Sequence, residues 1–327
     1  MKKTLIALAV LAASTASMAQ VTLYGVADVS VGAINQTTGL GLANDKFQAI
    51  ASNILNNGNS RFGMKGVEDL GGGMKVGFNY EGGINIANGA GNTSGGTLFA
   101  RAANVYLEGG FGRLTAGRQL TTSFFSVASW ELTGTANYSV VANQFSFAAA
   151  GPRDSAAVKY DLKAGGFNAS AMFIPEGDAV YGTAANPKGK YDLSVGYGAG
   201  PLVASLAYNK VDAGNEGTNV GGSYNFGAVK VAASWTQGKT GAGATFAEGY
   251  SLGASVPMGA FTFTVDIAND TKFEDTDWLL EAKYALSKRT FVYGVFMRDG
   301  ASKGRVTAGN PLNKEVDGYA LGLRHNF

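Results

Sequence analysis

The chain has 327 residues, of which 48 are glycine, 11% are aromatic, only 15% are charged and none is cysteine. Soluble domains carry about 25% charged residues, so this composition argues against an ordinary soluble surface, and the lack of cysteine excludes disulfides and thiolate chemistry. The 26 basic and 24 acidic residues become 24 of each without Lys2 and Lys3, so only the placement of charge can indicate a ligand.

Residues 1–19 have the pattern of a secretory signal peptide. Two lysines precede an apolar run from Leu5 to about Ala16, and Ser17-Met18-Ala19 forms a cleavage site with small residues at its first and third positions. The run is shorter than the roughly 20 residues that a membrane-spanning helix needs. We expect cleavage after Ala19, which leaves residues 20–327 as a single mature domain.

Short glycine-rich turns alternate with longer polar loops along the rest of the chain, and strands are predicted between them. The seven short connections lie at 70–73, 109–112, 163–166, 198–201, 226–228, 257–260 and 285–289. The eight longer ones lie near 35–59, 85–97, 120–152, 176–189, 211–217, 238–246, 269–276 and 300–315. Seven plus eight connections give sixteen strands with both termini on the short-turn side, which is the pattern of bacterial outer-membrane barrels.

Hydrophobic and polar residues alternate with a period of two within these segments. Residues 261–267 and the closing residues 319–327, which end on Phe327, are clear examples. A soluble β-sandwich also alternates, but sixteen strands without a domain break favour a membrane barrel, the only spanning fold available without long apolar helices. We therefore predict an all-β fold, a transmembrane sixteen-stranded antiparallel β-barrel.

The predicted lumen is aqueous, because the inward positions are polar or charged and a sixteen-stranded barrel is too wide for side chains to fill. The longest connection, the third long loop at 120–152, is rich in aromatic side chains, among them Phe124, Phe125, Trp130, Phe145 and Phe147. Such a loop is too apolar to project into water. We predict that it folds inward and narrows the channel; an exposed loop that shields the top of an oligomer is the alternative.

Four segments and the last residue resemble the general porins of β-proteobacteria: 21–25 (VTLYG), 60–73 (SRFGMKGVEDLGGG), 110–119 (GFGRLTAGRQ), 285–289 (ALSKR) and Phe327. The resemblance implies a homotrimer in the outer membrane, surrounded by lipid and lipopolysaccharide and inserted by the barrel-assembly machinery. It also implies passive diffusion of small hydrophilic solutes, with anion preference common in the family. In that family the terminal phenylalanine serves as the assembly signal.

The predicted pore constriction comprises charged residues assigned to the inward face, together with the one acid of the third long loop: Arg61, Lys65, Glu81, Arg101, Glu131, Arg153 and Lys159. The resemblance matches Arg61, Arg101 and Arg153 to a family cluster of basic residues that faces the constriction, and Glu81 to an acidic partner there. A solvated lumen wall without a selective role is the alternative for each of these charges. The excess of basic residues predicts a preference for small anions.

Lys75 and Arg118 are further candidates for the channel lining. Lys75 shares the inward parity of Glu81, whereas strict alternation places Arg118 on the outer face unless a bulge or a contact between protomers intervenes. The family usually has Tyr and Gly where this chain has Asn104 and Tyr106. That departure leaves the facing of Arg101 open.

Other function classes have weak support in the sequence. The single histidine, His325, falls on the lipid-facing parity near the chain end, where no catalytic triad is expected, and neither cysteines nor a histidine cluster offer a metal site. Glu274, Asp275 and Asp277 could hold Ca²⁺, but their spacing is generic. No basic run indicates nucleic-acid binding, and no cofactor is expected. A substrate-tuned channel, and more remotely a barrel enzyme or an adhesin acting through the long loops, remain as alternatives to a general porin.

Overall fold

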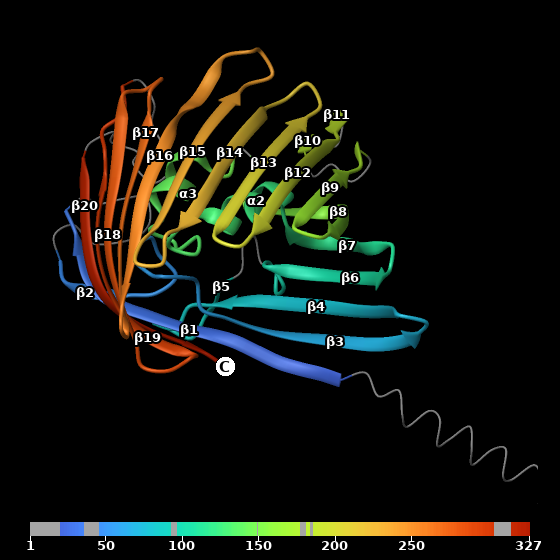
Figure 1. Cartoon of the computed structure of the whole chain (residues 1–327), viewed down its shortest axis with the longest axis horizontal. Helices are drawn as coiled ribbons and strands as arrows, with labels where there is room; N and C mark the ends of the chain where they lie inside the picture. Colours follow the sequence, from blue (N-terminus) through green and yellow to red (C-terminus); the bar gives the residue numbers. More distant parts are fainter. Residues whose placement is uncertain are drawn as a thin grey trace, which may run out of the picture.

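The structure, a computed structural model, describes residues 20–35, 46–92, 97–148, 150–176, 181–183, 186–303 and 315–327. The predicted signal peptide lies outside these ranges and stays a prediction. Sixteen strands of eight or more residues form a closed antiparallel barrel (Figure 1), which confirms the predicted fold. They are β1 (Gln20–Ile34), β3 (Arg61–Gly71), β4 (Met74–Ile84), β6 (Ala102–Gly109), β7 (Gly112–Leu120), β8 (Arg153–Ala164), β9 (Phe167–Ile174), β12 (Lys190–Ala199), β13 (Leu202–Val211), β14 (Glu216–Asn225), β15 (Lys230–Lys239), β16 (Thr245–Met258), β17 (Phe261–Asp270), β18 (Asp275–Ala285), β19 (Thr290–Asp299) and β20 (Val316–Asn326).

Four shorter strands lie in the long loops: β2 (Gln48–Ile50), β5 (Gly91–Asn92), β10 (Tyr181–Thr183) and β11 (Asn186–Lys188). The seven predicted short turns all join neighbouring barrel strands. Three consecutive glycines, 71–73, make the turn between β3 and β4 with φ angles of +79°, +61° and +80°, a region that glycine adopts without steric cost. Among the described residues, no helix is long and apolar enough to cross a membrane.

β1 closes the barrel because its two halves pair with different strands. Residues Gln20 to Val26 pair with β3, and Val26 to Ile34 pair with β20. Beyond the end of β20, the backbones of Phe327 and Gly25 exchange two hydrogen bonds of 3.0 and 3.1 Å. The last residue therefore pairs with the first strand near the rim of short turns.

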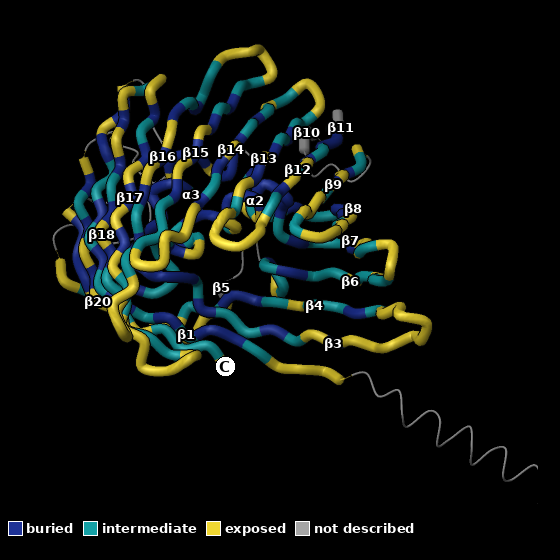
Figure 2. The backbone as a smooth tube through the Cα atoms, in the orientation of Figure 1, coloured by how far each residue is buried: buried dark blue, intermediate teal, exposed yellow. Residues whose placement is uncertain are grey.

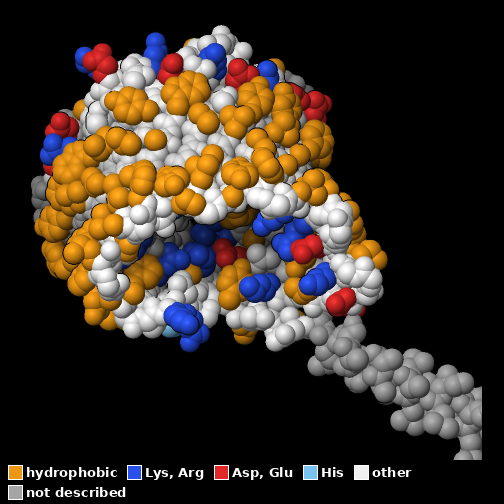
Figure 3. Space-filling view, in the orientation of Figure 1, with side chains coloured by type: hydrophobic (Ala, Val, Ile, Leu, Met, Phe, Trp, Pro, Cys, Tyr) orange, Lys and Arg blue, Asp and Glu red, His pale blue; other side chains and the backbone are white. Residues whose placement is uncertain are grey.

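The two faces of the wall have opposite chemistry, as the alternation predicts. On β17 the side chains of Phe261, Phe263 and Val265 are exposed, whereas those of Thr264 and Asp266, at alternate positions, are buried. Figure 2 shows this alternation of exposed and buried residues along the strands, and Figure 3 shows apolar side chains spread over the outer face of the barrel. An apolar outer face with a polar inner face is the arrangement of a barrel surrounded by lipid.

The third long loop folds into the barrel, as predicted, and forms two helices inside it (Figure 1). Thr121 is the N-cap residue of helix α2 (Thr122–Trp130), because its side-chain oxygen accepts a hydrogen bond from the N–H of Phe124. Helix α3 (Val140–Phe145) follows. The aromatic side chains of the loop are mostly buried. Phe125 differs, since 48% of it is exposed.

Helix α2 is fixed to strands β12 and β14 of the wall, by hydrogen bonds to the first and by close packing of a side chain on the backbone of the second. The buried carboxylate of Asp192 on β12 accepts hydrogen bonds from the hydroxyls of Thr122 (2.8 Å) and Ser123 (2.6 Å) and from the N–H of Ser123 (3.2 Å). The indole ring of Trp130 packs on Gly221 of β14, where an added Cβ would lie 2.3 Å from the ring. Gly221 is therefore required for the ring to reach the wall.

A hydrophobic core lies between the third long loop and the wall from β15 to β19. It contains Val127, Trp130, Tyr138, Val140, Val141, Phe145, Phe147, Ala232, Ala247, Ala268, Leu279, Tyr293, Val295 and Met297. The expectation that the inner face is polar throughout is wrong for this part of the wall. The folded-in loop covers it and excludes water, so apolar side chains such as Leu279 are buried there.

Candidate functional site

Four arginines line a cavity of about 910 Å³ between the wall and the third long loop. Arg61 and Arg153 are the first residues of β3 and β8, Arg101 immediately precedes β6, and Arg324 lies near the end of β20. Phe124 of α2 and loop residues 134–137 and 142–147 form the facing side. The cavity is therefore the narrowed part of the lumen, and we refer to it as the constriction.

Glu81 of β4 lies between two of these arginines. Its carboxylate makes ion pairs with Arg101 (Nε to Oε1, 2.6 Å) and with Arg61 (Nε to Oε2, 3.5 Å), and it accepts a hydrogen bond from the hydroxyl of Tyr24 (3.0 Å). The geometry brings together three residues that the sequence assigned to the constriction. The charge of this acid is shared by two cations and does not offset the other arginines.

Arg153 and Arg324 bind neutral acceptors. Arg153 Nε donates to the backbone carbonyl of Arg101 (3.0 Å), and Arg324 Nη1 donates to Oδ1 of Asn57 (2.6 Å). Neither arginine makes an ion pair within the described ranges. Arg324 was not predicted from the sequence, although its inward parity on the last strand was a usable signal.

Glu131 lies in the third long loop but is turned away from the lumen. It is only 4% exposed, and its carboxylate accepts hydrogen bonds from the N–H groups of Thr133 (3.0 Å) and Thr135 (2.7 Å) and the hydroxyls of Thr133 (2.6 Å) and Ser139 (2.8 Å). This acid therefore organises the loop backbone and does not line the constriction cavity.

Lys159 and Lys65 lie next to the constriction, on the side of the short turns. Lys159 is nearly buried, with Nζ 4.5 Å from the ring centroid of Phe125 and 3.4 Å from the carboxylate of Asp161. Lys65 Nζ is 5.3 Å from the ring centroid of Tyr24, and both lysines line one cavity that adjoins the constriction. They extend the basic wall below the narrowest part.

Lys75 and Arg118 do not line the constriction cavity. Lys75 is exposed near the start of β4, opposite Asp69 in the register. Arg118 donates to the hydroxyl of Ser155 (2.7 Å), and the pairing of β7 with β8 shifts between Gly117 and Gln119. The sequence suggested that Arg118 could face the lumen only if the strand carried a bulge. This shift in pairing is such a bulge, but Arg118 still does not line the constriction.

The acidic residues at and near the 269–276 loop form a different group from Glu274, Asp275 and Asp277, which the sequence suggested as a weak Ca²⁺ site. Glu274 pairs with Lys303 (2.5 Å), whereas carboxylate atoms of Asp275, Asp277 and Asp299 lie within 4.8 Å of one another. The N–H of Gly300 donates to Asp277 (2.8 Å). Acidic groups often lie close together in proteins that bind no metal there, so this cluster alone does not indicate a metal site.

A closed barrel with an apolar outer face, a charged lumen and a folded-in loop defines a transmembrane channel of the outer membrane. Residues 4–304 match the family model described as Gram-negative porin. The chain belongs to this family, and the protein is an outer-membrane porin.

Named relatives agree with the family match. Outer membrane porin protein 32 of Delftia acidovorans is 33% identical over 363 aligned positions that cover all of both chains. An outer membrane porin of Bordetella pertussis is 30% identical over 300 positions, covering 79% of this chain and 74% of that one. Among solved structures, the anion-selective porin from Comamonas acidovorans superposes with a TM-score of 0.76 at 26% identity, over 94% of this chain and all of that one. OmpT of Vibrio cholerae, at 14% identity and a TM-score of 0.66, shares the fold.

Proposed function

We propose that this porin conducts small hydrophilic solutes by passive diffusion with a preference for anions. The observation that carries the proposal is the charge balance at the constriction. Four arginines line it (Arg61, Arg101, Arg153 and Arg324) against two acids. Glu81 is shared by two of the arginines, Asp299 lies close to Asp275 and Asp277, and the loop acid is turned away. The structurally similar porin from Comamonas acidovorans is described as anion-selective, which supports the same preference.

Fixed charges act strongly in such a place because the narrow lumen focuses their field. A wall of one sign raises the local concentration of counter-ions, and rings of charged side chains set selectivity in other channels in the same way. Added salt screens the effect, with a Debye length of about 10 Å at 0.1 M. We therefore expect anion preference to be strongest at low salt.

Reversal potentials in a salt gradient across planar bilayers test the proposal. Chloride should be more permeant than potassium in the wild type, and Arg61→Glu together with Arg153→Glu should weaken or reverse that preference. Lys288→Glu together with Arg289→Glu is a matched control, because it makes the same change of charge in an exposed turn away from the constriction. Cation preference in the wild type, or an unmoved double variant, would contradict the proposal.

We also propose that the porin is a homotrimer in contact with outer-membrane lipid and lipopolysaccharide. The belt of exposed apolar side chains supports the contact with lipid, and one solved relative of the same fold, OmpT of Vibrio cholerae, is described in a trimer form. Native mass measurement of the detergent-solubilised protein distinguishes a trimer from a monomer.

A further inference from the structure

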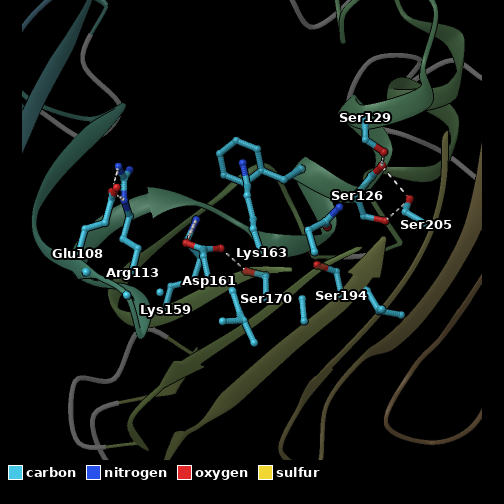
Figure 4. Close-up of a pocket in the computed structure, with 18 residues that line it drawn as sticks. Glu108, Arg113, Ser126, Ser129, Lys159, Asp161, Lys163, Ser170, Ser194 and Ser205 are labelled. Carbon is cyan, nitrogen blue, oxygen red and sulfur yellow. Dashed lines mark hydrogen bonds and ion pairs between the residues drawn. The ribbon is translucent and has the colours of Figure 1, made fainter. Parts of the chain in front are cut away.

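A second cavity lies beneath helix α2, toward the rim of short turns (Figure 4). It has a volume of about 600 Å³ and is lined by α2, by the turn from β6 to β7, and by β8, β9, β12 and β13. In an outer-membrane barrel the short turns face the periplasm. We refer to this cavity as the exit cavity, since it lies between the constriction and the periplasmic rim.

A run of cations joins the constriction to the exit cavity. An intermediate cavity shares Arg101 and Arg153 with the constriction, and it shares Arg113 and Lys159 with the exit cavity. The exit cavity adds Lys163. A diffusing anion can therefore pass from one basic side chain to the next without leaving the wall.

The cations of the exit cavity differ in how far their charge is neutralised. Arg113 is paired with Glu108 (Nε to Oε2, 2.6 Å), and Lys159 is paired with Asp161. Lys163 is exposed and makes no ion pair with a residue that the structure describes. It is therefore the cation of this cavity that is open to an incoming anion.

Hydroxyl and amide groups line the rest of the exit cavity. Figure 4 shows Ser126 and Ser205 joined at one side, with Asp161 and Ser170 joined near the middle; the bonds measure 2.8 and 2.5 Å. The hydroxyl of Ser194 makes no hydrogen bond within the described part of the chain, although it lies directly opposite Ser170 in the register. Asn168 is likewise opposite Lys163.

One apolar surface completes the lining. The ring of Phe125 is half exposed and faces this cavity as well as the intermediate one. A chloride ion would use only the cation. A solute with an anionic group on a hydroxylated carbon chain would use the cation, the free hydroxyl and amide, and the ring.

We propose that the exit cavity is a binding subsite for small polyhydroxylated anions, the chemistry of sugar acids and sugar phosphates. The anionic group binds Lys163, the hydroxyls bind Ser194 and Asn168, and the carbon chain lies against Phe125. The subsite rests on the proposed anion preference, because it receives the solutes that the constriction admits. It slows the release of such solutes relative to chloride.

Channel block in planar bilayers tests the subsite. Gluconate is added on the short-turn side, with hexanoate as a probe that has the charge without hydroxyls and sorbitol as one that has hydroxyls without charge. Gluconate should reduce the chloride current at the lowest concentration of the three. Lys163→Gln should weaken gluconate block by about two- to fivefold, as expected for one partly exposed ion pair.

Two variants make the result specific. Ser194→Ala should weaken block by gluconate and leave block by hexanoate unchanged, whereas Lys288→Gln, which removes a lysine from another exposed turn, should change neither. Equal block by gluconate and hexanoate, or unchanged gluconate block in Lys163→Gln, would overturn the subsite. Reversal potentials from the same membranes before the probe is added report anion preference separately, so the subsite can fail while the proposed function stands.

Discussion

Glu81 and Glu131 illustrate how the surroundings of a carboxylate decide its role. Both are acids that the sequence assigned to the constriction. Glu81 lies between two guanidinium groups of the lumen wall, whereas Glu131 binds four donors of its own loop out of reach of the lumen. The two residues carry the same charge, and only one of them can act on a passing ion.

This difference predicts opposite outcomes for the same substitution. Glu81→Gln should increase anion preference, because it frees the charge of Arg61 and Arg101. Glu131→Gln should leave the reversal potential close to the wild-type value. It should instead lower the thermal stability, since an amide in place of the carboxylate leaves buried donors without acceptors at about 1–3 kcal/mol each.

Reversal potentials and thermal unfolding of both variants, measured side by side, check the assignment. Each variant serves as the control for the other, because both remove one negative charge from the chain. A larger shift in reversal potential for Glu131→Gln than for Glu81→Gln would show that the loop acid acts on the lumen.

At the scale of elements, α2 keeps the channel narrow because it is tied to the far wall. Asp192 receives three donors at the first turn of the helix, where a carboxylate also complements the helix dipole, and Trp130 packs on Gly221 at its last residue. Tyr138 lies farther along the same loop and contacts Glu281 of β18. Burial is the main cause that raises the pKa of Tyr138 well above its ordinary range, and the neighbouring Glu281 is the second. Its hydroxyl therefore stays protonated and donates to Glu281 at 2.5 Å.

Gly221→Val should displace Trp130 and loosen the helix, because even a Cβ would meet the indole ring. We expect a noisier open-channel current and weaker anion preference, since solutes would pass farther from the arginines. Single-channel recording measures both. Gly227→Val controls for the loss of a glycine. An added Cβ in that exposed turn would touch no other atom, although the φ of +90° disfavours valine there. Equal currents in wild type and Gly221→Val would contradict the packing of Trp130 on the wall.

The strands could be predicted from the sequence because their signals are local. Glycine-rich turns and period-two alternation act over a few residues, and the segment around Gly71 shows both. The orientation of Glu131 could not be predicted, since it depends on loop donors that fold around it. Leu279 was missed for a related reason, because only the folded-in loop makes an inward leucine favourable.

At the scale of the whole molecule, the outer face and the closure of the barrel depend on the last strand. Tyr319, Leu321 and Leu323 continue the exposed apolar face, and the ring of Phe327 lies over Gly25, where a Cβ would be 2.3 Å from Cζ. The terminal aromatic thus completes the outer face and covers the joint between the first and last strands.

Deletion of Phe327 should reduce the yield of folded porin in the outer membrane, because the joint loses its backbone pairing with Gly25 and the aromatic signal that the family resemblance implies. Phe327→Tyr keeps both and should assemble as the wild type does. Outer-membrane fractionation with a heat-modifiability gel measures the folded amount. Wild-type yield after the deletion would contradict a role for this residue in assembly.

The pairing of β1 with β20 also sets the order of events during biogenesis. The two strands are neighbours in space but are the first and last barrel strands along the sequence, so no nascent chain can close the barrel before β20 has been synthesised. Every shorter chain has two strand edges with unpaired backbone groups, which hydrocarbon does not tolerate. A barrel closed in the periplasm would expose its apolar outer face to water. We therefore expect the chain to cross the periplasm open and protected from other strand edges, with closure coinciding with entry into the bilayer.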